Sequence, residues 1–169
     1  MSAPTIGSSP SRLSEVELAA WAGLLRAHAR LVGRLDAELR AEHGFGISSY
    51  EVLVRLAQSP NGMRLLDLSK SALITQSGMS RLVDRLETEG LVRRASSPDD
   101  GRGCLAVITE AGRRRLREAN RSHLAGVRRL FLDRLDADEM RALGDLWDRL
   151  ETGEEQPRRS GDDVLSRTR

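Results

Sequence analysis

The 169-residue sequence is poor in cysteine and in aromatic residues, and it has no long apolar run. Its single cysteine, Cys104, excludes an internal disulfide, and no stretch approaches the roughly 18 apolar residues that indicate a membrane span. No basic start followed by an apolar run lies near Met1, so we expect no secretory signal and a cytoplasmic location. A chain of this length can bury a core large enough for one domain without disulfides or metal.

Residue patterns that carry enzymatic chemistry are also missing. The sequence has no Ser, His and Asp in a catalytic order, no glycine-rich phosphate loop and no carboxylate pair in an apolar setting. Its histidines, His28, His43 and His123, have none of the close spacings of a zinc site with one another or with Cys104. The sequence therefore predicts that the protein is not an enzyme and that it binds no metal or cofactor.

Positive charge is concentrated in the middle of the chain. The formal net charge is only +2, which by itself does not indicate a nucleic-acid partner. Residues 64–117, however, carry a net charge of +4, and residues 133–155 carry a net charge of −6. This distribution is expected if the middle of the chain meets phosphate groups and the C-terminal part does not.

One amphipathic helix is predicted over about residues 75–89. Apolar residues at three- and four-residue spacings predict a single buried face, formed by Met79, Leu82, Val83 and Leu86. The hydroxyl of Thr75 is placed to cap the helix N-terminus, and Gly90 is placed to end the helix. The opposite face is polar at its N-terminal end, where it presents Gln76, Ser77, Ser80 and Arg81.

A β-hairpin follows this helix. Residues 91–95 and 104–108 have the length and composition of strands, and residues 96–103 between them are dense in turn formers. The guanidinium of Arg102 in this connection can reach phosphate or the minor groove. Asp100 would be repelled by DNA, so we expect it to fix Arg102 by accepting hydrogen bonds. A helix followed by such a basic hairpin predicts a winged helix-turn-helix.

The segment GLVRRASSPDDGRGCLAVITEAG resembles the wing of the MarR family of bacterial transcription regulators, including the Asp-x-Arg signature at Asp100 and Arg102. The resemblance extends to SRLVDRLETEG before the wing and covers roughly residues 15–151. It implies a mainly α fold with a small β wing, flanked by N- and C-terminal helices that interlock into a homodimer. It also implies a small-molecule pocket between the dimer helices and the DNA-binding lobe.

The domain organisation follows from breaks in periodicity and from capping signals. We expect a disordered tail over 1–13, a dimerisation helix over 14–46, a DNA-binding lobe over 47–109, C-terminal dimer helices over 110–151 and a disordered tail over 152–169. Capping boxes are predicted for Ser14 with Glu17, Ser48 with Glu51 and Asp136 with Glu139. Residues 63–65 are expected to pair with the wing, residues 66–73 to form a helix, and a helix capped by Thr109 to run to about residue 135.

Roles on DNA follow from helix geometry. Side chains near the N-terminus of a recognition helix reach base edges, so we assign base readout to Gln76, Ser77, Ser80 and Arg81. The alternative is that these are solvated polar residues on a surface helix. Contacts to the DNA backbone are assigned to Thr75, Arg85, Arg93 and Arg94. An alternative for Arg94 is an ion pair with Asp99 or Asp100.

The resemblance places an effector pocket near the aromatic residues. The candidates for its lining are Trp21, His28, Phe45 and Tyr50. The simpler alternative is that the aromatic residues belong to the core and that His28 is a buried, hydrogen-bonded histidine. Cys104 is expected to be a packed, unreactive thiol.

Two functions of different classes compete. The leading hypothesis is a homodimeric regulator, most often a repressor in this family, that binds a pseudo-palindromic operator in double-stranded DNA. Its two recognition helices would lie about 34 Å apart, one turn of DNA, and a small aromatic or anionic ligand would release it. The alternative is a winged-helix dimerisation or scaffold module that does not bind DNA.

Overall fold

The structure is a computed structural model that describes residues 12–72, 75–96 and 104–152. Contacts divide the chain into two compact units, Met1–Leu130 and Phe131–Arg169. Most of the two expected terminal tails lies outside the described residues. Within the described ranges, no helix combines the length and the apolar character needed to cross a membrane.

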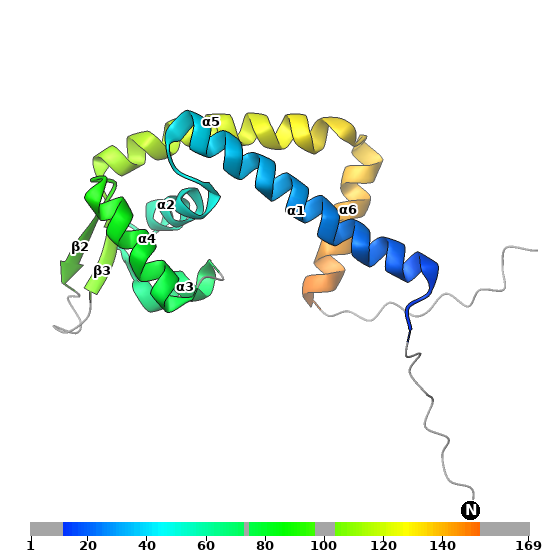
Figure 1. Ribbon diagram of the computed structural model, residues 1–169, viewed down its shortest axis with the longest axis horizontal. Coiled ribbons are helices and arrows are strands. Elements are labelled where there is room, and N and C mark those ends of the chain that lie inside the picture. The colour runs from blue at the N-terminus through cyan, green and yellow to red at the C-terminus, as the bar shows by residue number, and fades with distance from the viewer. Residues whose placement is uncertain (1–11, 73–74, 97–103, 153–169) are drawn as a thin grey trace, which may run out of the picture. The chain divides into compact units, whose positions relative to one another are not determined.

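The first unit is mainly helical and carries one small sheet, as the sequence predicts (Figure 1). Its helices are α1 (Glu15–His43), α2 (Ile47–Gln58), α3 (Leu65–Ser71), α4 (Gln76–Thr88) and α5 (Glu110–Leu130). Its strands are β1 (Met63–Arg64), β2 (Val92–Ser96) and β3 (Cys104–Ile108). Helices α1 and α5 pack against each other, and α2 packs against both.

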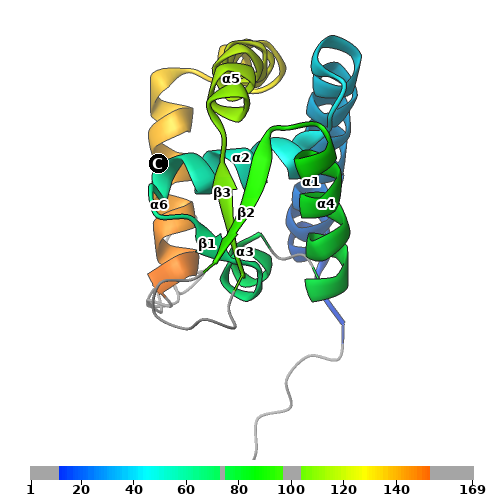
Figure 2. The same cartoon turned by 90° about the vertical axis from the view of Figure 1, so that its left-hand side faces the viewer.

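The sheet is antiparallel with β3 between β1 and β2 (Figure 2). Met63 lies opposite Ala106, so the short segment before α3 does pair with the hairpin. Val92 lies opposite Ile108 and Ser96 opposite Cys104, which gives the hairpin a regular ladder. Leu65, however, already belongs to α3, because that helix begins one residue earlier than predicted and ends at Ser71.

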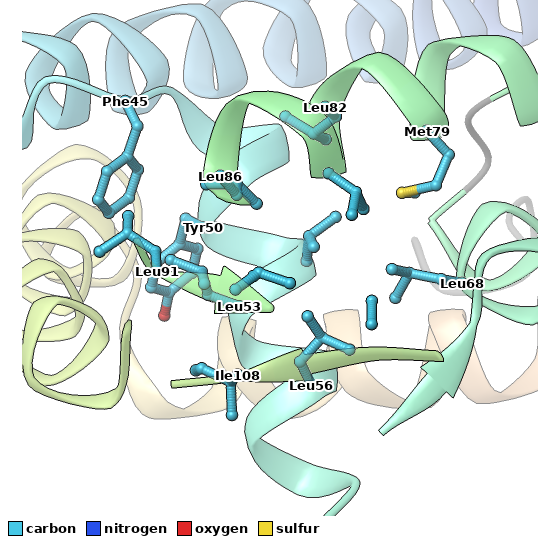
Figure 3. Packing of buried hydrophobic residues seen from close by; sticks show 14 of the residues in the cluster. Phe45, Tyr50, Leu53, Leu56, Leu68, Met79, Leu82, Leu86, Leu91 and Ile108 are labelled. Carbon is cyan, nitrogen blue, oxygen red and sulfur yellow. The ribbon is translucent and has the colours of Figure 1, made fainter. Parts of the chain in front are cut away.

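A single apolar core joins the sheet to the helices around it (Figure 3). Its largest fully buried side chains include Leu39, Leu53, Leu56, Leu68, Met79 and Leu86. These residues come from α1, α2, α3 and α4. Side chains of this size each contribute roughly 1.5–3 kcal/mol when fully buried. The core therefore fixes α4 against α2 and α3, which is the framework of a helix-turn-helix.

The start of α2 differs from the prediction. The proposed capping box of Ser48 and Glu51 is wrong, because the helix begins at Ile47 and its N-cap, Gly46, has no capping side chain. The backbone N–H of Ile47 instead donates to Asp36 Oδ1 of α1 at 2.8 Å. The Asp36 carboxylate of the preceding helix thus accepts from a backbone N–H that a local capping side chain would otherwise satisfy. Its negative charge is also favourable near the positive N-terminal end of the helix.

The other predicted caps are confirmed. Ser14 and Glu17 form a capping box at the start of α1, and the hydroxyl of Thr109 accepts from Gly112 N–H at 3.0 Å. Helix α5 ends at Leu130 and not near residue 135, because Phe131 leaves the helical conformation with φ −131° and ψ −66°.

The second unit contains a short 3₁₀ turn over Leu132–Arg134 and helix α6 over Ala137–Thr152. The predicted box of Asp136 and Glu139 is confirmed at the start of α6. The Glu139 N–H donates to Asp136 Oδ1 at 2.8 Å, and the Asp136 N–H donates to Glu139 Oε2 at 2.9 Å.

Candidate nucleic-acid interface

Helix α4 has one apolar face, and the burial of this face determines which side of the helix is turned toward the core. The four apolar residues predicted to be buried are all buried, namely Met79, Leu82, Val83 and Leu86. The Thr75 hydroxyl accepts from Gly78 N–H at 3.2 Å, which confirms Thr75 as the N-cap. The chain leaves α4 through Gly90, whose φ of +70° is accessible to glycine at little cost.

The polar face of α4 is consequently turned outward. Gln76, Ser77 and Arg81 are exposed, and Ser80 is half-buried. All four lie within the first turns of the helix, and the opposite face of the helix is buried in the core. Exposed amide, hydroxyl and guanidinium groups at a helix N-terminus have the chemistry to bond base edges in a major groove.

Arg85 lies on the flank of α4 that faces α2. Its Nη2 donates to the hydroxyl of Ser49 at 2.8 Å, and Ser49 is 1% exposed. The Arg85 side chain is itself 50% exposed. It therefore satisfies a buried hydroxyl of α2 and keeps part of its guanidinium accessible from outside.

A hollow of about 370 Å³ opens beside this flank, lined by Arg40, Ser48, Gly78, Arg81, Leu82 and Arg85. Three of these lining residues are arginines, contributed by α1 and α4. Arg40 Nε donates to Asp36 Oδ2 at 2.7 Å, and this hydrogen bond holds the pKa of the Asp36 carboxyl below its ordinary value. The lining carries positive charge, which suits an anionic group.

The two arginines of β2 have different surroundings. Arg93 is exposed. Arg94 Nη1 donates to Asp84 Oδ1 at 2.7 Å and to Glu87 Oε2 at 3.1 Å, and both carboxylates belong to α4. The ion-pair partners predicted from the sequence as an alternative were instead Asp99 or Asp100, in the connection between the strands. That connection, residues 97–103 with Asp100 and Arg102, lies outside the described residues.

The four predicted effector-pocket residues differ in burial within one chain. Trp21 and His28 are exposed on α1, whereas Phe45 and Tyr50 are buried in the core. Phe45 and Tyr50 therefore fit the simpler alternative, whereas His28 is exposed in the single chain. The exposure of His28 follows from its position on the part of α1 that extends beyond the core of the first unit.

Tyr50 takes part in a small polar cluster between α2 and α5. Its hydroxyl donates to Asn120 Oδ1 at 2.7 Å, and its ring lies 4.5 Å from the ring of His123. Burial raises the pKa of Tyr50 and lowers the pKa of His123. The cluster therefore fixes the packing of α2 on α5 with both rings uncharged.

Sequence reasoning missed two arginines that hold helix ends. Arg113 Nη1 donates to Ala57 O of α2 at 3.3 Å, and Arg115 Nη2 donates to His43 O of α1 at 2.7 Å. Carbonyl groups in the last turn of a helix lack helical partners, so these arginines are structural. Three consecutive arginines were a usable signal, because a packed helix cannot turn all of them fully toward solvent.

Cys104 is exposed at the start of β3, so the expectation of a packed thiol is wrong. Burial on β3 begins only further along the strand, at Ala106, so Cys104 lies on the end of the strand that the core does not cover. Among the residues that the structure describes, no group of three or more His, Cys, Asp or Glu side chains could hold a metal ion.

Comparison with known proteins agrees with this architecture. The sequence model of the MarR family matches residues 46–104. The HTH-type transcriptional repressor Rv2887 of Mycobacterium tuberculosis is 30% identical over 127 residues, which cover 71% of this chain and 90% of that protein. The HTH-type regulator YdgJ of Bacillus subtilis is 31% identical over 84 residues, and this match spans only 51% of its length.

Solved structures give the same result. The MarR family regulator Sco3205 of Streptomyces coelicolor, solved in complex with DNA, superposes with a TM-score of 0.79 at 34% identity, covering 88% of this chain and 94% of that one. CouR of Rhodococcus jostii, solved with bound p-coumaroyl-CoA, gives a TM-score of 0.66 at 25% identity over 79% and 92% of the two chains. This chain belongs to the MarR family of transcription regulators.

Proposed function

We propose that the protein is a homodimeric repressor that binds a pseudo-palindromic operator and reads it with helix α4. The observation that carries the proposal is the polar N-terminal face of α4, where Gln76, Ser77 and Arg81 are exposed while the opposite face is buried. Ser80 completes the base-reading group. The repressor Rv2887 and the DNA-bound regulator Sco3205 support this function by similarity.

Contacts to the DNA backbone are assigned to residues that flank this face. Thr75 at the N-cap, Arg85 and Arg93 can reach phosphates on either side of a groove occupied by α4. Arg102, with Asp100 as its support, is proposed to extend the contact through the wing. Phosphate contacts position the protein and carry no sequence information, whereas the α4 contacts select the bases.

Dimerisation is supported by apolar side chains that one chain leaves exposed. Leu18, Trp21 and Leu25 of α1 are 54%, 54% and 49% exposed and recur at three- and four-residue spacings. In α6, Trp147 and Leu150 are 38% and 64% exposed. Exposed apolar residues on one helix face mark an interaction surface, on α1 and on α6 each taken by itself, and the heptad-like spacing on α1 fits a partner helix.

The decisive experiment for this function is DNA binding as a function of salt. A duplex should first be selected from a random pool with the full-length protein, and its affinity should then be measured by fluorescence anisotropy at several salt concentrations. A protein that contacts six or more phosphates loses orders of magnitude in affinity, with a slope of about −0.9 per contact. A flat or absent response would instead favour the alternative, a dimerisation or scaffold module without DNA binding.

Variants separate the two kinds of contact. Gln76→Ala or Arg81→Ala should relax the preference at particular base pairs, each by about 1–3 kcal/mol. Arg93→Ala should weaken binding to all sequences and make the salt slope shallower by about 0.9.

Trp21→Asp should halve the mass seen in sedimentation and weaken operator binding, because each half-site would be held by a separate chain.

Effector release is proposed to start from the hollow beside α4. Its volume of about 370 Å³ lies within the size range of small-ligand sites, and Arg40, Arg81 and Arg85 give it positive charge. A small aromatic carboxylate held there would compete with DNA for two α4 arginines. The shift in DNA affinity cannot exceed the ligand's preference for the unbound protein.

The effector proposal is tested by titrating benzoate and salicylate into the protein–operator complex. Release by either compound in the wild type, with loss of the response in Arg40→Gln, is the expected result. Arg40 lies on α1, outside the reading helix, so this variant should retain operator binding. Release that is unchanged in Arg40→Gln would place the effector elsewhere.

A further inference from the structure

Arg94 occupies the middle of β2, where it pairs with Ala106 of β3. Its side chain is 32% exposed. An arginine in the wing of a DNA-binding protein is an obvious candidate for a phosphate contact. The contacts that Arg94 makes within the chain indicate a different use.

Two carboxylates of α4 bind the guanidinium from one side. Asp84 Oδ1 and Glu87 Oε2 accept from Nη1 at 2.7 and 3.1 Å. Glu87 also accepts the backbone N–H of Arg94 through Oε1 at 3.0 Å. One glutamate therefore holds both the main chain and the side chain of a single strand residue, which fixes orientation as well as distance.

The bridge adds a polar connection between two parts that are also joined by a short turn and by the apolar core. Helix α4 ends at Thr88 and β2 begins at Val92. A rotation of the hairpin about this turn would change where the wing meets the duplex relative to α4. Because Asp84 and Glu87 are three residues apart on the same face of the helix, Arg94 ties the strand to a defined side of α4.

The position of Asp84 makes the bridge relevant to DNA. Asp84 lies seven residues after Ser77, so the two share a helix face, and Asp84 is 54% exposed. An unpaired carboxylate there would repel phosphate. The hydrogen bond that Arg94 donates to Asp84, together with the attraction of Asp84 and Glu87, raises the pKa of Arg94.

We propose that Arg94 is a positioning residue that sets the wing relative to the recognition helix through Asp84 and Glu87, and that it is not a phosphate contact. This inference rests on the proposed DNA-binding function. It predicts that removing a negative charge from the DNA-facing side of α4 weakens operator binding, which is the opposite of the simple electrostatic effect.

The test compares Asp84→Asn, Arg94→Gln and the double variant with Asp67→Asn as the matched control. Asp67 is an exposed carboxylate of α3 with no ion-pair partner among the described residues. Anisotropy is measured with the selected operator and with an unrelated duplex of equal length, across salt. Thermal unfolding shows that each variant is folded, and Glu87→Gln provides a second break of the bridge.

Asp84→Asn and Arg94→Gln should each weaken operator binding roughly three- to tenfold, and the double variant should lose no more than either, because residues in one network are coupled. Asp67→Asn should bind as well as the wild type or more tightly. The salt slope of Arg94→Gln should equal that of the wild type, since no phosphate contact is lost.

Two results would overturn the inference. Tighter binding by Asp84→Asn, as in the control, would show that the carboxylate acts only through its charge. A salt slope shallower by about 0.9 in Arg94→Gln would show that the arginine contacts phosphate. Failure of the proposed function is a separate result, because then the wild-type protein would bind neither duplex even at low salt.

Discussion

Substitution of Gly112 by alanine should destabilise the protein although alanine is the better helix former. Gly112 lies in the first turn of α5, directly after the wing. A Cβ at this position would overlap the carbonyl oxygen of Leu91 and lie 2.8 Å from Ile108 Cγ1. The Leu91 oxygen cannot easily move away, because it accepts from Thr109 N–H at 3.0 Å and from the Thr109 hydroxyl at 3.2 Å.

The size of the effect follows from two opposing contributions. Overpacking of a tight site costs about 1–3 kcal/mol, and alanine in a helix gains up to about 1 kcal/mol over glycine. A net loss of about 1–2 kcal/mol in the free energy of unfolding is expected. Gly33→Ala is the matched control, because Gly33 lies within α1 with nothing within 4 Å of its added Cβ. That variant should gain about 0.5–1 kcal/mol.

Urea unfolding of both variants and of the wild type, at one fixed protomer concentration, measures these differences. The expected order of stability is Gly33→Ala, then the wild type, then Gly112→Ala. If Gly112→Ala were as stable as Gly33→Ala, the close approach of α5 to the turn before β2 would be wrong. The joint between the wing and the long helix α5 would then need a different explanation.

Two further predictions concern α4 and the cluster between α2 and α5. Thr75→Ala should cost about 1 kcal/mol through loss of the helix cap and should speed hydrogen exchange of the Gly78 amide, whereas unchanged exchange would contradict the cap. Burial lowers the pKa of His123 from its ordinary 6.5, so the unfolded chain takes up the proton first as the pH falls. The stability that depends on neutral His123 is therefore complete above pH 6.5 and is lost as the pH falls through the lowered pKa. Urea midpoints across this range should depend less on pH in His123→Gln, and an identical pH dependence in both proteins would refute the assignment.

Local patterns were enough to predict the DNA-reading element. The buried face of α4 follows from the spacing of Met79, Leu82, Val83 and Leu86, and its start follows from the hydroxyl of Thr75. The two strands of the wing follow from short apolar runs on either side of turn formers. These features depend on residues close together in the sequence, where helix and strand periods restrict the alternatives.

Features that depend on distant partners were not predicted. The cap of α2 comes from Asp36, a residue of the preceding helix, and nothing local distinguishes it from an exposed carboxylate. The buried face of α5 is formed largely by small residues, Gly112, Ala119 and Gly126. Large apolar residues do not mark this face, since Leu124 of the same helix is 51% exposed.

The roles of the arginines show the same limit. A guanidinium has a long reach and five donors, so composition cannot tell a phosphate contact from an internal bridge. Arg94 binds Asp84 and Glu87, and Arg113 and Arg115 bind backbone carbonyls of α2 and α1. A net charge counted along the sequence therefore overstated the charge available to DNA.

The measurement that tests the central claim most directly is the ratio of affinities for the selected operator and for a scrambled duplex of the same composition. In the wild type this ratio should reach at least about 10³ at physiological salt, as for specific DNA-binding proteins. It should fall at particular base pairs in Gln76→Ala and Arg81→Ala. A wild-type ratio near one, or a ratio that neither substitution changes, would contradict the claim that the exposed face of α4 reads the operator.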